Sequence, residues 1–225
     1  MPTAIVTGAS RGLGFALTAA LLREGRRVVV DARGARELEA AERELSALGD
    51  VVAVRGNVTD TDHRQALVDA AGPEIDLLVN NASALGPSPM PALADYPLHA
   101  LETVFRVNVI APLALAQLVL PRLTGPIVNL TSDAAVEPYE GWGGYGSSKA
   151  ALDHLTAILA AEHPDRRIYA VDPGDMRTKM HQDAFPGEDI SDRPPPEESV
   201  PGLLALIEGE LPSGRYRAAE LGARV

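Results

Sequence analysis

The 225-residue chain contains no cysteine. Disulfide frameworks, thiolate nucleophiles and cysteine metal sites are therefore excluded. Basic residues are also few, because 20 Lys and Arg stand against 31 Asp and Glu and give a net charge of −11. Non-specific nucleic-acid binding and attachment to an anionic membrane surface both need the opposite sign of charge, so we expect neither partner.

Long apolar runs are missing as well. No stretch reaches the roughly 18 uninterrupted apolar residues of a membrane-spanning helix. The N-terminus lacks the basic and then apolar layout of a signal peptide, so we expect a cytoplasmic protein. His154, His163 and His181 have no metal-ligand spacing with acidic partners, and we expect no metal site. Apolar residues make up 46% and charged residues 23%, which is typical of one soluble globular domain, here 1–225.

Lysine is the scarcest basic residue, because only Lys149 and Lys179 occur and the other basic residues are arginines. Tyr145 precedes Lys149 by four positions, which places both side chains on one face of a helix. A tyrosine hydroxyl in water has a pKa near ~10. A nearby ammonium favours the phenolate and makes the tyrosine a usable general acid or base. Taken alone, the pair could also be exposed side chains at the start of a surface helix.

A glycine-rich turn follows the first apolar run, 3–7. Gly8, Gly12 and Gly14 lie between this expected strand and a helical pattern at 15–24. Such a turn exposes backbone N–H groups at a helix N-terminus, where a pyrophosphate binds well. A glycine turn without a nucleotide is the alternative.

Expected strands and helices alternate along the chain, which requires parallel strands with crossover helices. After 3–7, the expected strands are 27–32, 51–54, 75–79, 126–130, 167–171 and an edge strand near 214–217. After 15–24, the expected helices are 34–48, 60–71, 98–120 (interrupted at Pro112), 144–162 and 197–208. The proline-rich stretch 185–199 belongs to an expected substrate flap around 175–199.

Five motifs in order resemble the short-chain dehydrogenase/reductase family. They are Thr7-Gly8-x-x-x-Gly12-x-Gly14, Asn80-Asn81-Ala82, Ser132 thirteen residues before Tyr145, Tyr145-x-x-x-Lys149, and Asp172-Pro173-Gly174 followed by Thr178. The resemblance covers about 3–218 and matches the compact members of the family. It implies a Rossmann-like, doubly wound parallel α/β sheet of about seven strands in the order 3-2-1-4-5-6-7, flanked by helices.

The resemblance also implies roles for four residues. Tyr145 transfers the proton, and Lys149 binds the nicotinamide ribose and lowers the tyrosine pKa. Ser132 hydrogen-bonds the substrate carbonyl, and Asn108 holds a water in the proton relay. The implied cofactor-binding residues are Gly8, Ser10, Arg11, Gly12, Leu13, Gly14, Arg33, Asn57, Val58, Asn80, Ala82, Tyr145, Lys149, Pro173, Gly174, Met176 and Thr178.

Two residues depart from the family pattern. Ser83 stands where the family usually has glycine, and Asn57 stands where it often has an aspartate that meets the adenine amino group. An asparagine carbonyl can still accept that hydrogen bond, and neither departure touches the proton-transfer group.

The choice of cofactor depends on the end of the second strand. Asp31 lies at a distance from the glycines that fits a ribose-binding acid and NAD. In the family register, however, the NAD-binding acid corresponds to Ala32, and the arginine of NADP-binding members corresponds to Arg33. Successive strand residues point to opposite sides, so Asp31 should face away from the Ala32 direction. We therefore expect NADP(H), with Arg11 as a second cation for the 2′-phosphate.

The expected substrate pocket lies between 83–90, 134–142 and 175–185, and its composition favours a moderately apolar carbonyl or alcohol. The family resemblance implies a homodimer or homotetramer formed through helices 98–120 and 144–162. The leading hypothesis is an NADP(H)-dependent oxidoreductase that interconverts a small ketone or aldehyde and its alcohol. Two alternatives stay open: a nucleotide-sensing binding protein of the same fold, and a reductase of a C=N or C=C bond.

Overall fold

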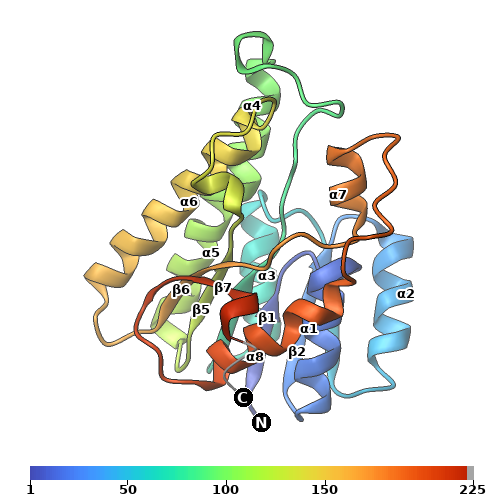
Figure 1. The fold of residues 1–225 in the computed structure, drawn as a ribbon. Helices are drawn as coiled ribbons and strands as arrows, with labels where there is room; N and C mark the ends of the chain where they lie inside the picture. Colours follow the sequence, from blue (N-terminus) through green and yellow to red (C-terminus); the bar gives the residue numbers. More distant parts are fainter. Residues whose placement is uncertain (222–225) are drawn as a thin grey trace.

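The computed structural model describes residues 1–221, which form a seven-stranded parallel sheet between two layers of helices (Figure 1). The strand order is β3-β2-β1-β4-β5-β6-β7, which confirms the expected topology. The strands are β1 (Thr3–Val6), β2 (Arg27–Ala32), β3 (Val51–Arg55), β4 (Leu77–Asn80), β5 (Ile127–Leu130), β6 (Ile168–Asp172) and β7 (Gly214–Arg217). The last four residues of the expected domain lie outside the described residues.

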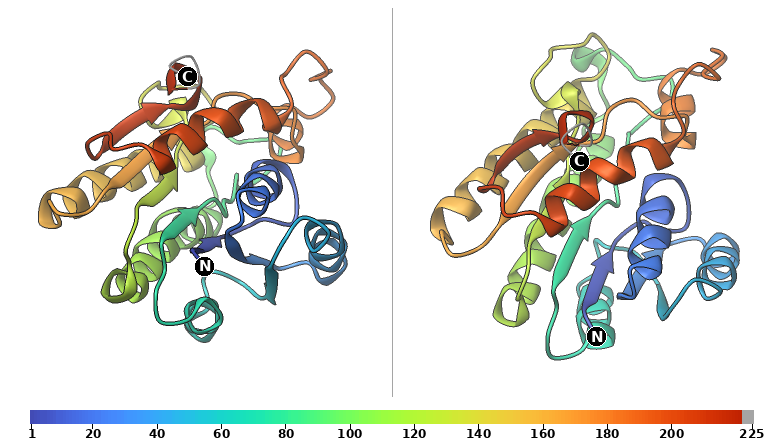
Figure 2. Two further views of the ribbon diagram at one scale, coloured as in Figure 1. Left: turned by 90° about the horizontal axis from the view of Figure 1, so that it is seen from below. Right: turned by 60° about the horizontal axis from the view of Figure 1, so that its bottom comes forward.

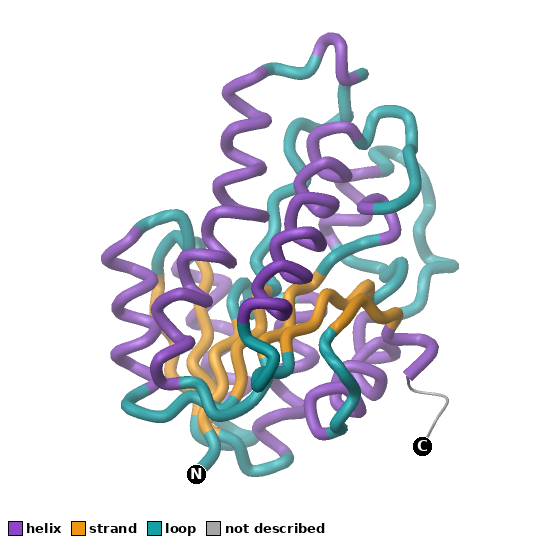
Figure 3. Tube along the Cα trace, turned by 90° about the vertical axis from the view of Figure 1, so that its left-hand side faces the viewer, coloured by secondary structure: helices purple, strands orange, loops and turns teal. Residues whose placement is uncertain are grey.

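Alternation along the strands divides the core into two apolar layers. In β1, Ala4 and Val6 pack on one face of the sheet and Ile5 packs on the other, all fully buried. The first face is covered by α1 (Gly12–Arg23), α2 (Ala35–Leu45) and α8 (Val200–Glu208). The second face is covered by α3 (Thr61–Ala71), α5 (Ala111–Val119) and α6 (Gly143–Glu162). Figures 2 and 3 show the strands enclosed between these layers.

The expected long helix at 98–120 is divided into several segments. It consists of α4 (Leu98–Phe105), a π-helical turn (Arg106–Ile110), α5 and a short 3₁₀ turn (Leu120–Arg122). Pro112 has no N–H, so it cannot donate the usual i+4 hydrogen bond to the carbonyl of Asn108. The interruption expected at the proline is therefore centred on Asn108, which is fully buried.

The span 98–122 is also long and apolar enough, by length and composition, to cross a membrane. Half of its most apolar window is buried inside the protein. Its buried residues Leu115, Ala116 and Val119 pack on the sheet, as in a core helix.

Two shorter segments follow β6. The expected flap contains α7 (Lys179–Ala184), whose N-cap Thr178 accepts a hydrogen bond from the N–H of His181. The described chain ends with α9 (Ala218–Leu221) after β7. The loops after β1, β2, β4, β5 and β6 leave the same edge of the parallel sheet, so the motifs at the carboxyl ends of these strands are brought together.

Candidate active site

The glycine turn between β1 and α1 has the backbone that its sequence requires. Gly8 has φ 67°, and a Cβ at this position would lie 2.8 Å from the Cα of Ala82. Gly12 also has a positive φ, 59°, and begins α1. Only glycine meets both demands at Gly8, so the turn can pass close beneath the Asn-Asn-Ala motif.

A cavity of about 1220 Å³ lies over this turn. It is large enough for a dinucleotide, since binding sites for small molecules commonly measure about 300–1,000 Å³. The expected cofactor-binding residues that line it are Gly8, Ser10, Arg11, Gly12, Leu13, Arg33, Asn57, Val58, Ala82, Tyr145, Lys149, Pro173, Met176 and Thr178.

Three expected cofactor-binding residues do not line this cavity. Gly14 packs against Asn81 and the carbonyl of Gly8, so its role is close packing of the turn. Asn80 is buried and donates a hydrogen bond from Nδ2 to Asn129 Oδ1 at 2.7 Å, which makes it a link between β4 and β5. Gly174 lines the smaller neighbouring cavity instead.

Asn81, which the sequence did not single out, joins the Asn-Asn-Ala motif to the glycine turn. Its Nδ2 donates to the carbonyls of Thr7 at 2.7 Å and Gly8 at 3.1 Å. The Thr7 hydroxyl accepts from the N–H groups of Asn81 and Ala82, each at 3.0 Å. The two motifs therefore hold each other in place, and Asn81 lines the cavity that they form.

Asp31 supports the glycine turn from below. Its Oδ1 accepts a hydrogen bond from the N–H of Gly8 at 2.6 Å, and its Oδ2 lies 2.8 Å from Nε2 of His63. Both side chains are almost fully buried. The carboxylate is thus hydrogen-bonded within the protein, although Asp31 also contributes to the lining of the cofactor cavity. His63 was not anticipated, because no local motif links it to Asp31, 32 positions away.

Cationic side chains gather at the cofactor cavity. Arg11 and Arg33 are exposed and line it, as expected. Arg177 and Lys179, which sequence reasoning did not assign, line it from the flap side. Lys179 is paired with Asp183 at 2.7 Å. Arginine at the end of β2 suits a phosphate group, because its planar fork can make two hydrogen bonds to phosphate oxygens.

Tyr145 and Lys149 lie one turn apart on α6 and are both buried. The Lys149 ammonium lies 5.5 Å from the centroid of the Tyr145 ring and donates a hydrogen bond to the carbonyl of Leu130 at 2.7 Å. The pair is therefore part of the cavity floor, and the alternative of two exposed side chains on a surface helix is excluded for this structure.

The pKa of Tyr145 departs from the expectation that Lys149 lowers it. Burial raises the pKa of the Tyr145 hydroxyl well above its ordinary value, and the Asp172 and Asp133 carboxylates act in the same direction. Hydrogen bonds with the Ser83 and Ser132 hydroxyls lower it. Burial also lowers the pKa of Lys149 to about 8. Burial of both groups therefore determines the direction of the two pKa shifts.

Ser132 lies two residues beyond the end of β5, beside Tyr145. Its Oγ donates to Asp133 Oδ1 at 2.9 Å and accepts from the N–H of Ala134 at 3.2 Å. Its backbone carbonyl accepts a hydrogen bond from Arg215 of β7 at 3.0 Å. Arg215 also lies 3.0 Å from Asp153, one turn beyond Lys149 on α6. Sequence reasoning missed Arg215, since only the β6–β7 pairing brings it to the site.

Asn108 connects the loop after β4 to α6. Its Oδ1 accepts from the N–H of Ala84 at 2.7 Å and from Ser83 Oγ at 3.2 Å. Its Nδ2 donates to the Ala84 carbonyl and to Ser148 Oγ, each at 2.9 Å. The Asn108 side chain therefore holds the loop after β4 against α6. The Asn108 backbone carbonyl receives no hydrogen bond from residue 112, because Pro112 has no N–H.

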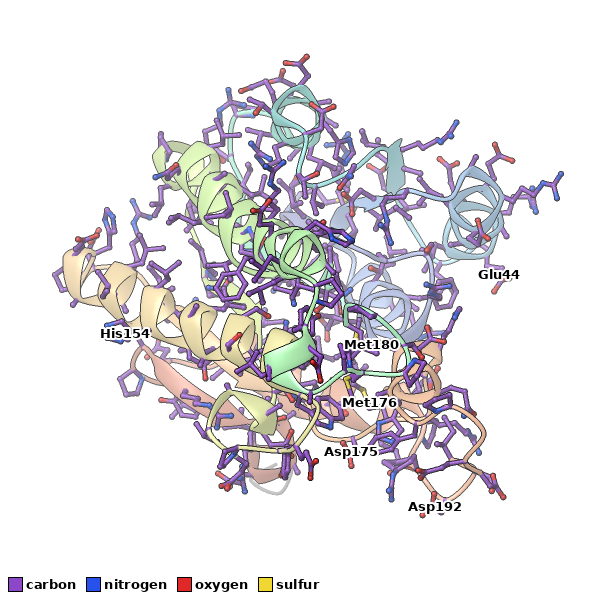
Figure 4. All side chains as sticks on the ribbon, turned by 90° about the horizontal axis from the view of Figure 1, so that it is seen from above. Glu44, His154, Asp175, Met176, Met180 and Asp192 are labelled. Atoms are coloured by element: carbon purple, nitrogen blue, oxygen red, sulfur yellow. The ribbon has the colours of Figure 1, made fainter. Side chains whose placement is uncertain are left out.

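A smaller cavity of about 100 Å³ opens beyond Tyr145, away from the glycine turn. The two cavities adjoin, since they share the lining residues Leu85, Thr131, Tyr145, Pro173, Met176, Thr178 and Met180. Figure 4 shows Met176 and Met180 next to each other there, with Asp175 close by. Of the expected pocket segments, 83–90 and 175–185 line the two cavities. From 134–142, only Trp142 lines a cavity, and Ala134 belongs to the same apolar cluster as Tyr145.

No group of three or more His, Asp or Glu side chains that could hold a metal ion occurs within residues 1–221.

A nucleotide-sized cavity over a glycine turn, next to a buried Tyr–Lys pair, agrees with comparisons to known proteins. A family model described as short chain dehydrogenase matches residues 2–189. The chain belongs to the short-chain dehydrogenase family. Like its relatives that are named as reductases, it is an oxidoreductase.

Three similar proteins illustrate this relationship. Benzil reductase ((S)-benzoin forming) of Saccharomyces cerevisiae is 35% identical over 193 residues, which cover 80% of this chain and 73% of that protein. Sepiapterin reductase of Mus musculus is 34% identical over 197 residues, covering 79% and 76%. A short chain dehydrogenase of Shigella flexneri 2a str. 301, solved in complex with NADP, has a TM-score of 0.87 and 26% identity over 97% of both chains.

Proposed function

We propose that this short-chain dehydrogenase is an NADP(H)-dependent oxidoreductase that interconverts a small-molecule ketone or aldehyde and its alcohol. The observation that carries the proposal is the meeting of Ser132, Tyr145 and Lys149 at the junction of the two cavities. The larger cavity fits a dinucleotide, and the smaller one leaves room for a substrate beside the tyrosine hydroxyl. The reductase names of the benzil and sepiapterin relatives support a carbonyl substrate.

NADP(H) is favoured over NAD(H) by the charges at the end of β2. Arg33 lines the cavity there, whereas Ala32 offers no carboxylate to a ribose hydroxyl and Asp31 is engaged by Gly8 and His63. An NADP complex of a structural neighbour supports the same cofactor. The diphosphate would lie against the N–H groups of the glycine turn, and Asn57 and Val58 would line the adenine end.

The nicotinamide supplies the hydride chemistry when bound. Tyr145 exchanges a proton with the substrate oxygen through its hydroxyl. Its raised pKa keeps it protonated at neutral pH, ready to donate to a developing alkoxide. Ser132 donates a hydrogen bond to the same oxygen and stabilises its negative charge. Lys149 binds the ribose hydroxyls, and Asn108 holds a water in the proton relay through its backbone carbonyl.

Two other functions use the same fold. In a nucleotide-sensing binding protein, the cofactor would bind and no substrate would turn over. The intact set of Ser132, Tyr145 and Lys149 disfavours that function, since binding alone does not need them. Reduction of a C=N or C=C bond is the second alternative, and a substrate panel that includes imines and enones separates it from carbonyl reduction.

A titration followed by a turnover assay tests the proposal. Full-length protein should bind NADPH about tenfold or more tightly than NADH, as expected for an arginine that pairs with a phosphate. Arg33→Ala should remove most of this preference. Tyr145→Phe should abolish turnover of a ketone and keep NADPH affinity within about twofold, because it removes the proton donor only. Near-normal activity of Tyr145→Phe would contradict the assigned role, and a preference for NADH would contradict the cofactor.

The proposal includes assembly and location. Exposed apolar side chains on α4, the π-helical turn and α6 support a homodimer or homotetramer formed through these helices. The lack of cysteine gives no sign of an oxidising compartment and supports a cytoplasmic location.

A further inference from the structure

The smaller cavity, which we call the substrate end, carries an excess of negative charge. Asp133, Asp172 and Asp175 line it, and His181 is the only basic side chain among its lining residues. The cofactor cavity has the opposite character, with Arg11, Arg33 and other cations along its walls. The cleft is therefore polarised along its length, with cations over the glycine turn and carboxylates beyond Tyr145.

The three carboxylates differ in how well their charges are balanced. Asp172 lies 3.6 Å from Arg215 and 4.0 Å from Arg217. Asp175 lies 3.9 Å from both His181 and Arg193.

Asp133 has only neutral partners. Its Oδ1 accepts from Ser132 Oγ at 2.9 Å and from the N–H of Ala134 at 2.8 Å, and its Oδ2 accepts from the Tyr139 hydroxyl at 3.0 Å. Within residues 1–221, no cationic side chain forms an ion pair with it. Its field reaches the reaction centre, because Asp133 contributes to the raised pKa of Tyr145.

An aromatic wall stands next to this carboxylate. The Trp142 ring lies edge-on to Tyr145 with centroids 5.8 Å apart, and its centroid is 5.9 Å from that of Phe185. Trp142 lines the substrate end together with Met180. A tryptophan face attracts ammonium groups more strongly than any other side-chain ring.

Thr131 supplies an unused polar group at the same place. Its hydroxyl is buried without a hydrogen-bond partner in the protein, and the residue is 3% exposed. Thr131 lines both cavities, next to Ser132. A buried hydroxyl without a partner is costly, which indicates that a bound molecule completes its hydrogen bonding.

We propose that the substrate end binds a carbonyl compound or alcohol that carries a positively charged amine on an aromatic or apolar body, with Asp133 as the anionic partner and Trp142 as the aromatic face. The carbonyl or hydroxyl group of this substrate class rests on the proposed function, whereas its positively charged amine is inferred from the substrate end alone. Compounds bearing a carboxylate or phosphate at this end are rejected, because they would meet Asp133 without a free cation.

The only tryptophan of the chain is Trp142, so intrinsic fluorescence reports directly on this cavity. The full-length protein is titrated, with and without saturating NADP⁺, with benzylammonium, benzyl alcohol and phenylacetate. Benzylammonium should bind at least about tenfold more tightly than phenylacetate, with benzyl alcohol between them. The difference should shrink as salt is raised from about 0.05 to 0.5 M, since charge causes it. Equal affinities, or a preference for phenylacetate, overturn the proposal.

Asp133→Asn tests the anionic partner, because it removes the charge and keeps a carbonyl that can accept from Ser132 and Ala134. The ratio of the benzylammonium and phenylacetate affinities should fall to within about threefold. Glu44→Gln makes the same change of net charge on α2 at a residue that lines neither cavity, and it should leave the ratio unchanged. An unchanged ratio in folded Asp133→Asn overturns the assignment to Asp133. If that variant does not fold, the salt dependence of the wild-type ratio decides.

Turnover separates this inference from the proposed function. With NADPH, 4-(aminomethyl)acetophenone should be reduced with a kcat/KM at least about tenfold above that of 4-acetylbenzoate. Charge-selective binding without turnover of either ketone contradicts the proposed function and upholds the binding preference. Turnover of both ketones at equal efficiency upholds the proposed function and contradicts the charge preference of the substrate end.

Discussion

Ser83, at which this chain departs from the family pattern, lies against Tyr145. While Tyr145 is neutral, the Ser83 hydroxyl donates to Asn108 Oδ1 at 3.2 Å. When Tyr145 ionises, the same O–H can turn to the tyrosinate oxygen, and this hydrogen bond lowers the tyrosine pKa. The expectation that this departure does not touch the proton-transfer group was therefore wrong. Burial and two carboxylates act in the opposite direction on the same group. A glycine at this position would leave Tyr145 with the Ser132 hydroxyl as its remaining side-chain partner. The serine therefore lowers the pH at which Tyr145 ionises, in a site where burial and two carboxylates raise it.

Ser83→Ala should shift the pH dependence of alcohol oxidation. Oxidation needs the ionised tyrosine, and loss of a hydrogen bond to the charged form raises its pKa. Such a bond contributes roughly 1.5–3 kcal/mol, which corresponds to about one pH unit or more. The rising limb of kcat/KM against pH should therefore move to higher pH by about that amount. Ser46→Ala, which removes an exposed hydroxyl bonded to Glu42, is the control.

A rising limb at the wild-type pH in Ser83→Ala would show that Ser83 does not act on Tyr145. Unaltered NADPH affinity in the variant would establish that any shift arises from proton transfer and not from a damaged cofactor cavity.

The elements of the sheet could be predicted from the sequence because the buried parallel strands are short apolar runs bounded by turns. Strand order followed from the family motifs, and β2 was predicted at its observed bounds. The glycine turn and the Ser132, Tyr145 and Lys149 motifs could also be predicted, because each depends on the spacing of residues that are close in the sequence. The linings of the two cavities could not be predicted in the same way, because they combine residues that are far apart in the sequence.

The parts that could not be predicted depend on long-range contacts. His63 reaches Asp31 only after α3 packs beneath β2, and Arg215 reaches Ser132 only after β7 joins the sheet. The π-helical turn at Asn108 has only Pro112 as a local signal, and a proline indicates an interruption without giving its form. The pKa of Tyr145 was predicted in the wrong direction, because burial of the pair is a property of the packed site.

Edge strand β7 reaches the candidate active site through Arg215. One guanidinium holds the Ser132 carbonyl at 3.0 Å and Asp153 at 3.0 Å, and so fixes the end of β5 against α6. Arg215→Met should lower kcat about tenfold, because small displacements of a positioned group slow the reaction strongly. NADPH affinity should stay within about twofold, since Arg215 does not line the cofactor cavity.

Arg217→Met is the matched control on the same strand. Its side chain is 53% exposed and lies 4.0 Å from Asp172, so its loss should change kcat little. Partial recovery of kcat in Arg215→Lys would support positioning by charge and hydrogen bonding. Equal losses in both methionine variants would instead indicate general damage to β7.

At the scale of the whole molecule, the sheet is covered on both faces, and α4, α5 and α6 lie together in one helical layer (Figure 1). Leu98, Ile110 and Ile158 are 73%, 54% and 41% exposed. They lie on neighbouring helices, because α6 packs against both α4 and the π-helical turn. This surface is where the proposed homo-oligomer would form, with the same face of each copy in contact across a two-fold axis.

Ile110→Glu should therefore dissociate the oligomer into monomers. A carboxylate buried at a two-fold interface would face its own copy, and the cost of desolvating it exceeds what one apolar contact contributes. Light scattering at micromolar concentration should give the variant the mass of one chain, 23.7 kDa. The wild type should have two or four times that mass. Val136→Glu is the matched control, because Val136 has the same 54% exposure and lies outside α4, α5 and α6. A monomeric wild type would refute the assembly, and an oligomeric Ile110→Glu would place the contact on another surface.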